Sequence, residues 1–113
     1  MHVIHHATLP RHVEGGCCRR TVAGAPICAA PFVVETVAVD PGSSTAPACG
    51  APAFVVIALA GSGKLVLHGG PERFQAPCTL VVPAGVGHRF VNTGAAPLEL
   101  VCVRAPGAIP EAP

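Results

Sequence analysis

The sequence predicts an all-β fold built as a single antiparallel domain. Thirteen glycines and thirteen prolines interrupt the chain at short intervals. The segments between them have the length of strands and are rich in β-branched and other apolar residues, and none carries a clear helical period. With 113 residues the chain is long enough for one small domain but not for two. Short strands and regular turns of this kind are typical of a sandwich or a barrel.

The strands are expected in a regular order along the chain. They are residues 32–39 (FVVETVAV), 53–60 (AFVVIALA), 64–68 (KLVLH), 79–83 (TLVVP), 88–92 (HRFVN) and 98–103 (LELVCV). Turn sequences separate them at DPGSS (40–44), GSG (61–63) and HGGPE (68–72). The chain therefore divides into a lead-in (1–31), a barrel (32–104) and an irregular tail (105–113). We expect the lead-in to be loosely packed, with a short strand or two that could serve as an edge or dimer strand.

Charge and composition exclude several kinds of partner. Seven basic and six acidic side chains leave a net charge of +1, which gives no electrostatic attraction to nucleic acid or an anionic membrane. No apolar run approaches the roughly 20 residues that cross a bilayer. The N-terminal residues do not have the pattern of a signal peptide, so we expect a cytoplasmic location with reduced cysteines. A small apolar domain gains stability by pairing, so we also expect a homodimer.

One short stretch, PAGVGHRFVNTG (83–94), resembles the second sequence motif of the cupin superfamily. In cupins this motif reads Gly, five residues, Pro-x-Gly, two residues, His, three residues, Asn. The chain has Pro83, Gly85, His88 and Asn92 at these intervals, and Pro77 replaces the leading glycine. The resemblance implies a single antiparallel cupin-type β-barrel, a double-stranded jelly roll.

The first cupin motif keeps its glycine frame at residues 42–61 but has none of its metal ligands. Its two histidine positions fall on Ala48 and Gly50, and its glutamate position falls on Phe54. In cupins that keep both motifs, these three side chains and the second-motif histidine hold a divalent metal. His88 alone cannot do so, because a mononuclear site needs about three protein ligands. We therefore expect no metal cofactor.

Alternation along residues 88–92 places His88, Phe90 and Asn92 on one face, which the resemblance turns towards the barrel interior. Alternation along residues 53–60 adds Phe54 and Val56. A pocket of this composition suits a small, largely apolar organic ligand with His88 as the polar anchor. The expected ligand-binding residues are His88, Phe90, Asn92, Phe54, Val56 and Cys49.

Other interpretations of His88 stay open, and the sequence leaves undecided whether the protein is an enzyme. His88 could be the catalytic residue of a metal-independent isomerase, cyclase or lyase, acting as a general acid or base. A partner carboxylate would come from Glu35 or Glu99, whose faces the sequence does not fix, although such residues are more often solvent-facing. Cys49 could be a nucleophile, or it could join His88 and a lead-in histidine in an unusual metal site.

Finally, His88 could be a remnant without function, and Phe54 could either fill the old site or form the wall of an open pocket.

Overall fold

A computed structural model describes residues 3–25, 27, 30–49 and 52–105, excluding the side chain of Cys49. One 3-10 turn, η1, covers His6–Thr8, and all other regular elements are strands. The strands are β1 (His12–Glu14), β2 (Cys17–Ala23), β3 (Val33–Val39), β4 (Ala48–Cys49), β5 (Phe54–Ala60), β6 (Ser62–Leu67), β7 (Gly70–Gln75), β8 (Cys78–Val82), β9 (Gly87–Asn92) and β10 (Leu98–Arg104). The all-β prediction is therefore confirmed.

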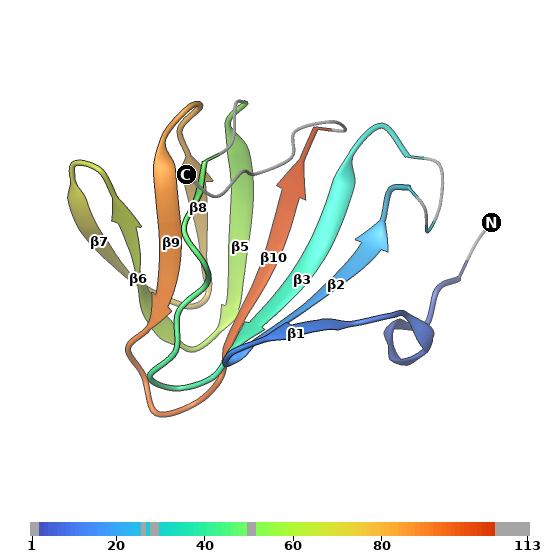
Figure 1. The fold of residues 1–113 in the computed structure, drawn as a ribbon, viewed down its shortest axis with the longest axis horizontal. Coiled ribbons are helices and arrows are strands. Elements are labelled where there is room, and N and C mark those ends of the chain that lie inside the picture. Colours follow the sequence, from blue (N-terminus) through green and yellow to red (C-terminus); the bar gives the residue numbers. More distant parts are fainter. Residues whose placement is uncertain (1–2, 26, 28–29, 50–51, 106–113) are drawn as a thin grey trace.

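The strands form two antiparallel sheets. The larger sheet has the order β1-β2-β3-β10-β5-β8, and the smaller one has the order β4-β9-β6-β7. In Figure 1 the larger sheet fans out from β5 to β1, while β9, β6 and β7 lie at the other side of the molecule. Neighbouring strands such as β3 and β10 are far apart in sequence, so long connections join strands of the two sheets. Such connections are typical of a jelly roll.

The core forms where the alternating faces of the two sheets meet. In β10, Leu98, Leu100 and Cys102 are buried while Glu99 is exposed. In β5, the inward side chains include Phe54, which is 7% exposed. Burial of these apolar faces is the main favourable term for the fold. The buried core residues are Cys17, Val37, Val39, Phe54, Val56, Ala58, Leu65, Val82, Phe90, Leu98, Leu100 and Cys102.

The predicted hairpin turn between β5 and β6 depends on Gly61. This residue has a φ of +96°, a conformation that side chains with a Cβ rarely adopt. A Cβ at this position would also lie 2.9 Å from the carbonyl oxygen of Pro97. Gly61 therefore allows both the tight turn and the close approach of the chain that leads into β10.

Two segments are more regular than the sequence predicts. The region of residues 68–72 was expected to be a turn, but the turn is limited to residues 68–69, and the paired strand β7 begins at Gly70. In the lead-in, β2 is a seven-residue strand paired with β3, and Cys17 at its start is buried. Its sequence, CCRRTVA, has no apolar alternation that would reveal a strand.

At the chain ends the structure covers only part of the predicted segments. The tail is described only at residue 105, so the expected irregular tail lies almost entirely outside the described residues. Among the residues that are described, no helix has the length and hydrophobicity needed to cross a membrane.

Candidate functional site

His88 lies at the start of β9, directly after the Pro-rich turn, and its side chain is 8% exposed. Thr45 fixes this strand from the side. Its Oγ1 accepts a hydrogen bond of 2.9 Å from the backbone N–H of Phe90, and its own N–H donates to the Phe90 carbonyl at 2.9 Å. Further along, Ala48 of β4 is the direct register partner of His88. The position where the cupin resemblance expects a histidine therefore lies opposite His88 but carries only a methyl group.

Two aromatic rings flank the imidazole of His88. The ring of Phe54 lies 5.1 Å away between centroids at a tilt of 55°, and the ring of Phe90 lies 6.1 Å away, edge to face. Phe54 comes from β5 in the larger sheet, and Phe90 comes from β9 in the smaller sheet. His88 is therefore flanked by apolar rings at the place where the metal ligands gather in the cupins that the sequence resembles.

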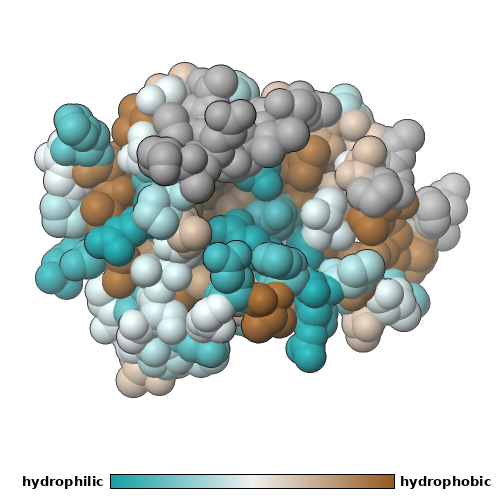
Figure 2. Space-filling view, in the orientation of Figure 1, coloured by the Kyte–Doolittle hydropathy of each residue, from teal (hydrophilic) through white to brown (hydrophobic). Residues whose placement is uncertain are grey.

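A pocket of about 270 Å³ opens beside this group. Its walls combine apolar side chains with one imidazole and two guanidinium groups. The lining residues are Arg19, Val37, Thr45, Ala46, Pro47, Ala48, Phe54, His88, Phe90, Leu100, Cys102 and Arg104. In Figure 2, hydrophilic side chains gather around a hollow near the middle of the molecular face. An apolar cavity of roughly 150 Å³ accepts a benzene molecule, so this pocket has room for a small organic ligand.

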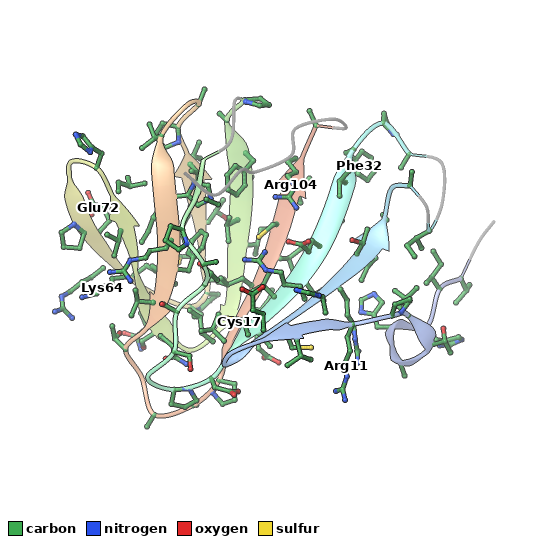
Figure 3. All side chains as sticks on the ribbon, in the orientation of Figure 1. Arg11, Cys17, Phe32, Lys64, Glu72 and Arg104 are labelled. Carbon is green, nitrogen blue, oxygen red and sulfur yellow. The ribbon has the colours of Figure 1, made fainter. Side chains whose placement is uncertain are left out.

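A charged cluster adjoins the pocket: Arg19 and Arg104 line it, and Glu35 pairs with both of them. One carboxylate oxygen of Glu35 lies 2.8 Å from a guanidinium nitrogen of Arg19 and 3.4 Å from one of Arg104. The side chains of Glu35 and Arg104 are only 13% and 14% exposed, whereas that of Arg19 is 32% exposed. Figure 3 shows Arg104 near the C-terminal end of β10. Three strands, β2, β3 and β10, thus each bring one charged side chain to this cluster.

His88 is neutral in this environment. Burial lowers the pKa of its imidazole below the ordinary value, and the positive charges of Arg104 and Arg19 lower it further, while the Val86 carbonyl acts in the opposite direction. The Nδ1 atom lies 3.2 Å from this carbonyl oxygen. Because a carbonyl only accepts hydrogen bonds, Nδ1 carries the proton, and Nε2 keeps a lone pair that has no hydrogen-bond partner among the described residues. Neutral His88 can therefore accept a hydrogen bond or a proton at Nε2.

The thiol of Cys102 also lines the pocket. Burial raises its pKa to about 11, and the nearby carboxylate of Glu35 adds to this effect. The thiol therefore stays protonated at neutral pH. A thiol is a far weaker nucleophile than a thiolate, so Cys102 contributes a small, weakly polar surface rather than a reactive group.

The predicted ligand-binding residues fall into three groups. His88, Phe90 and Phe54 line the pocket. Val56 is fully buried in the core, and Asn92 is 3% exposed with its amide bound to the backbone; neither is among the lining residues. Cys49 pairs with Gly87 in the ladder, but its side chain lies outside the described part of the structure.

The charged residues are the main feature that sequence reasoning missed. Glu35 was considered as a partner carboxylate that is more often solvent-facing, but it points inward, whereas Glu99 is exposed on the opposite face of its sheet. Arg19 and Arg104 were not considered. A signal did exist for Arg104, since it continues the inward alternation of Leu100 and Cys102.

The residues around His88 do not fit the metal site that the cupin fold implies. In the described ranges, no three His, Cys, Asp or Glu side chains gather into a group that could hold an ion. The register partner of His88 is Ala48, and its ring neighbour is Phe54, neither of which has a donor atom. The positive charges of Arg19 and Arg104 also act against a bound cation.

Comparisons with solved structures place this geometry among cupins. The polyketide cyclase RemF from Streptomyces resistomycificus is 22% identical, with a TM-score of 0.83 over 99% of this chain and 84% of that chain. A cupin 2 domain-containing protein from Halorhodospira halophila is 25% identical, with a TM-score of 0.78 over 90% of this chain and 73% of that chain. An oxalate decarboxylase from Lactobacillus farciminis, solved as a formate complex, is 19% identical, with a TM-score of 0.87. This match covers 96% of the present chain but only 34% of that enzyme.

The expected cupin-type jelly roll is therefore confirmed by fold similarity. No curated protein sequence matches the chain. A family model described as "Cupin domain" matches residues 35–104, which is more than half of the 113 residues. Although the first-motif ligands are missing, the chain therefore belongs to the cupin domain family.

Proposed function

We propose that this chain is a metal-independent cupin that binds a small, largely apolar organic molecule in its barrel pocket, with His88 as the polar anchor. The observation that carries the proposal is the replacement of the expected metal ligands by Ala48 and Phe54 beside a pocket of about 270 Å³. Loss of the ligands has left a space with apolar walls, and a few convergent polar groups can orient a guest there.

The protonation state of His88 specifies what it can anchor. Nδ1 is occupied by the Val86 carbonyl, so Nε2 is the atom that remains for a ligand. As a lone-pair acceptor it suits a hydroxyl or N–H group. The phenyl rings of Phe54 and Phe90 would contact the apolar body of the same molecule. A ring or short chain that bears a hydroxyl group fits both requirements.

The test is a search for co-purified or added ligand in tag-free protein. We expect native mass spectrometry to detect a bound small organic molecule, and His88→Ala to weaken its retention. His68→Ala is the matched control, because His68 lies in the turn between β6 and β7, outside the pocket lining. Protein that carries no guest and binds none from a set of small hydroxylated aromatics would contradict the proposal.

A second candidate is metal-independent acid–base catalysis by His88. The favouring observation is the buried neutral imidazole, whose Nδ1–H is held by Val86 while Nε2 is free to take a proton. The fold similarity to a polyketide cyclase makes an enolisation or cyclisation the reaction class to test. The probe is deuterium exchange from solvent into the central carbon of a β-diketone, followed by NMR. Catalysed exchange that His88→Ala abolishes would support this candidate, and exchange at the uncatalysed rate would contradict it.

We also propose a cytoplasmic location without nucleic-acid or membrane partners. The near-zero net charge supports the second part of this proposal. Cys17, Cys18, Cys78 and Cys102 are free thiols, in keeping with a reducing compartment. Localisation of a tagged full-length chain by cell fractionation tests this proposal.

A further inference from the structure

The pocket wall contains more positive than negative charge. Glu35 faces two guanidinium groups, those of Arg19 and Arg104, and uses the same carboxylate oxygen for both. Among the described residues, no other acidic side chain lies within ion-pair distance of either arginine. Among the described residues, these three side chains therefore carry a net charge of +1.

This excess charge lies on a mostly buried part of the pocket wall. The Arg104 side chain is 14% exposed, so most of its surface is removed from water. A buried guanidinium is stabilised only when acceptors satisfy its donors. The planar group has five N–H donors, and the contact with Glu35 at 3.4 Å is longer than an ideal charged hydrogen bond. Arg104 therefore retains capacity for a second acceptor.

Both arginines line the same pocket as His88, Phe54 and Phe90. A guest that extends from the aromatic rings would therefore meet the guanidinium groups within one cavity of about 270 Å³. Guanidinium groups recognise carboxylates in particular, because two parallel N–H donors match two carboxylate oxygens. We propose that the ligand of this pocket is a small organic acid whose carboxylate is bound by Arg104 and Arg19.

This inference rests on the proposed binding function and narrows its ligand class. It assigns Glu35 the role of an internal counter-ion that keeps the two arginines in place but neutralises only one of them. The carboxylate of the ligand then supplies the missing negative charge. His88 remains available at Nε2 for a hydroxyl group elsewhere on the same molecule, so an aromatic hydroxy acid would use the imidazole and both guanidinium groups.

The experiment compares two probes of the same shape, benzoate and benzamide, by NMR titration of the full chain. Benzoate is expected to bind at least about tenfold more tightly, since charge-assisted hydrogen bonds are stronger than neutral ones. Arg104→Gln should remove most of this preference. Arg73→Gln is the matched control, because it deletes the same charge at an exposed site on β7 and should leave the preference unchanged.

A second variant, Glu35→Gln, is expected to change the affinity for benzoate in the opposite direction. Glu35→Gln removes the internal negative charge, so the affinity for benzoate should rise severalfold while the affinity for benzamide stays the same. Loss of folding cannot produce such a gain. If Arg104→Gln does not fold, Arg104→Lys replaces it, with an expected partial loss of preference because the forked donor geometry is lost.

Equal affinity for benzoate and benzamide would overturn the carboxylate inference while leaving the binding function in place. Failure of both probes to bind would overturn the carboxylate inference, whereas the binding function is contradicted only if the hydroxylated aromatics fail to bind as well. A preference for benzoate that survives Arg104→Gln and Arg19→Gln together would overturn the assignment to these arginines.

Discussion

The imidazole of His88 packs against the phenyl ring of Phe54, with 5.1 Å between the ring centroids. His88 occupies the position of the second-motif ligand of cupins, and Phe54 occupies the position of the first-motif glutamate. Two positions that would share a metal therefore still lie side by side, but they now form an aromatic pair. The spatial frame of the two positions is kept, but here they carry an imidazole and a phenyl ring beside a pocket that Arg19 and Arg104 also line.

Asn92 is predicted to stabilise the fold and not to bind ligand. Its amide donates to the carbonyl oxygens of Val39 and Ala96, both at 2.9 Å, and accepts from the N–H of Gly94 at 2.8 Å. Asn92→Ala should therefore lower the free energy of unfolding by about 2–4 kcal/mol, since it breaks buried hydrogen bonds to the backbone. Denaturant unfolding measures this loss. Ligand affinity should be unchanged in the fraction that folds, and Thr93→Ala, at an exposed neighbour, is the control.

The fold could be predicted because its inward faces alternate in a simple way. Strands β5 and β9 carry buried residues at every second position, and the alternation also placed Phe54, His88 and Phe90 on the inward face. The cupin resemblance then supplied the arrangement of these strands in space. These are local patterns that a single sequence contains.

The charged wall could not be predicted in the same way. Glu35 faces inward because its strand pairs with β10, where Cys102 is its register partner. That pairing joins residues far apart in sequence. Arg19 lies in a strand without apolar alternation, and charged residues are rarely placed in an interior unless a partner is already known. Only the three-dimensional pairing of β2, β3 and β10 brings the partners together.

His88 is expected to make the protein less stable in mild acid. The folded state lowers the pKa of His88 from its ordinary 6.5, chiefly through burial, so the unfolded chain takes up a proton before the folded chain does. The contribution of neutral His88 to stability is therefore complete above pH about 6.5 and falls as the pH drops below that value. Free energies of unfolding from pH 8 to 5 should decline more steeply for the parent than for His88→Gln. Parallel curves would show that His88 titrates alike in both states.

The vacated metal site is expected to be restorable. Ala48 is the register partner of His88, and the ring of Phe54 packs against the His88 imidazole. Ala48→His with Phe54→Glu would therefore place two new donors next to the existing imidazole. Three such ligands can hold Zn²⁺ or Ni²⁺. Elemental analysis after dialysis without chelator should find near-stoichiometric metal in the double variant and none in the parent. Further substitution of His88→Ala should remove the metal, and stoichiometric metal in the parent would contradict the metal-free proposal.

We propose that the chain forms a homodimer through the outer face of its larger sheet. Ile57 and Leu59 of β5 and Val81 of β8 are apolar residues on this face, with exposed fractions of 37%, 59% and 66%. Contact with a second copy would remove this apolar surface from water. Sedimentation should show a dimer at micromolar concentration and a monomer for Leu59→Lys. Gln75→Lys, at an exposed position of β7, is the charge-matched control, and a monomeric parent protein would refute the proposal.

Phe54 is predicted to be the wall of a working pocket rather than a plug. Its side chain is 7% exposed, yet it lines the cavity together with His88. A phenylalanine packed on all sides costs about 3–5 kcal/mol when truncated to alanine, because a new cavity must form. One side of the Phe54 ring already borders open space, so Phe54→Ala should cost less than about 3 kcal/mol in denaturant unfolding. Ligand should stabilise the parent by an amount that rises with the logarithm of its concentration above Kd, and this stabilisation should disappear in Phe54→Ala. Val56→Ala is the matched core control, since Val56 is fully buried and outside the pocket lining; its loss of stability should not be accompanied by loss of ligand stabilisation. A cost above about 3 kcal/mol for Phe54→Ala, with no ligand effect on the parent, would instead identify a barrel whose old metal site has been filled.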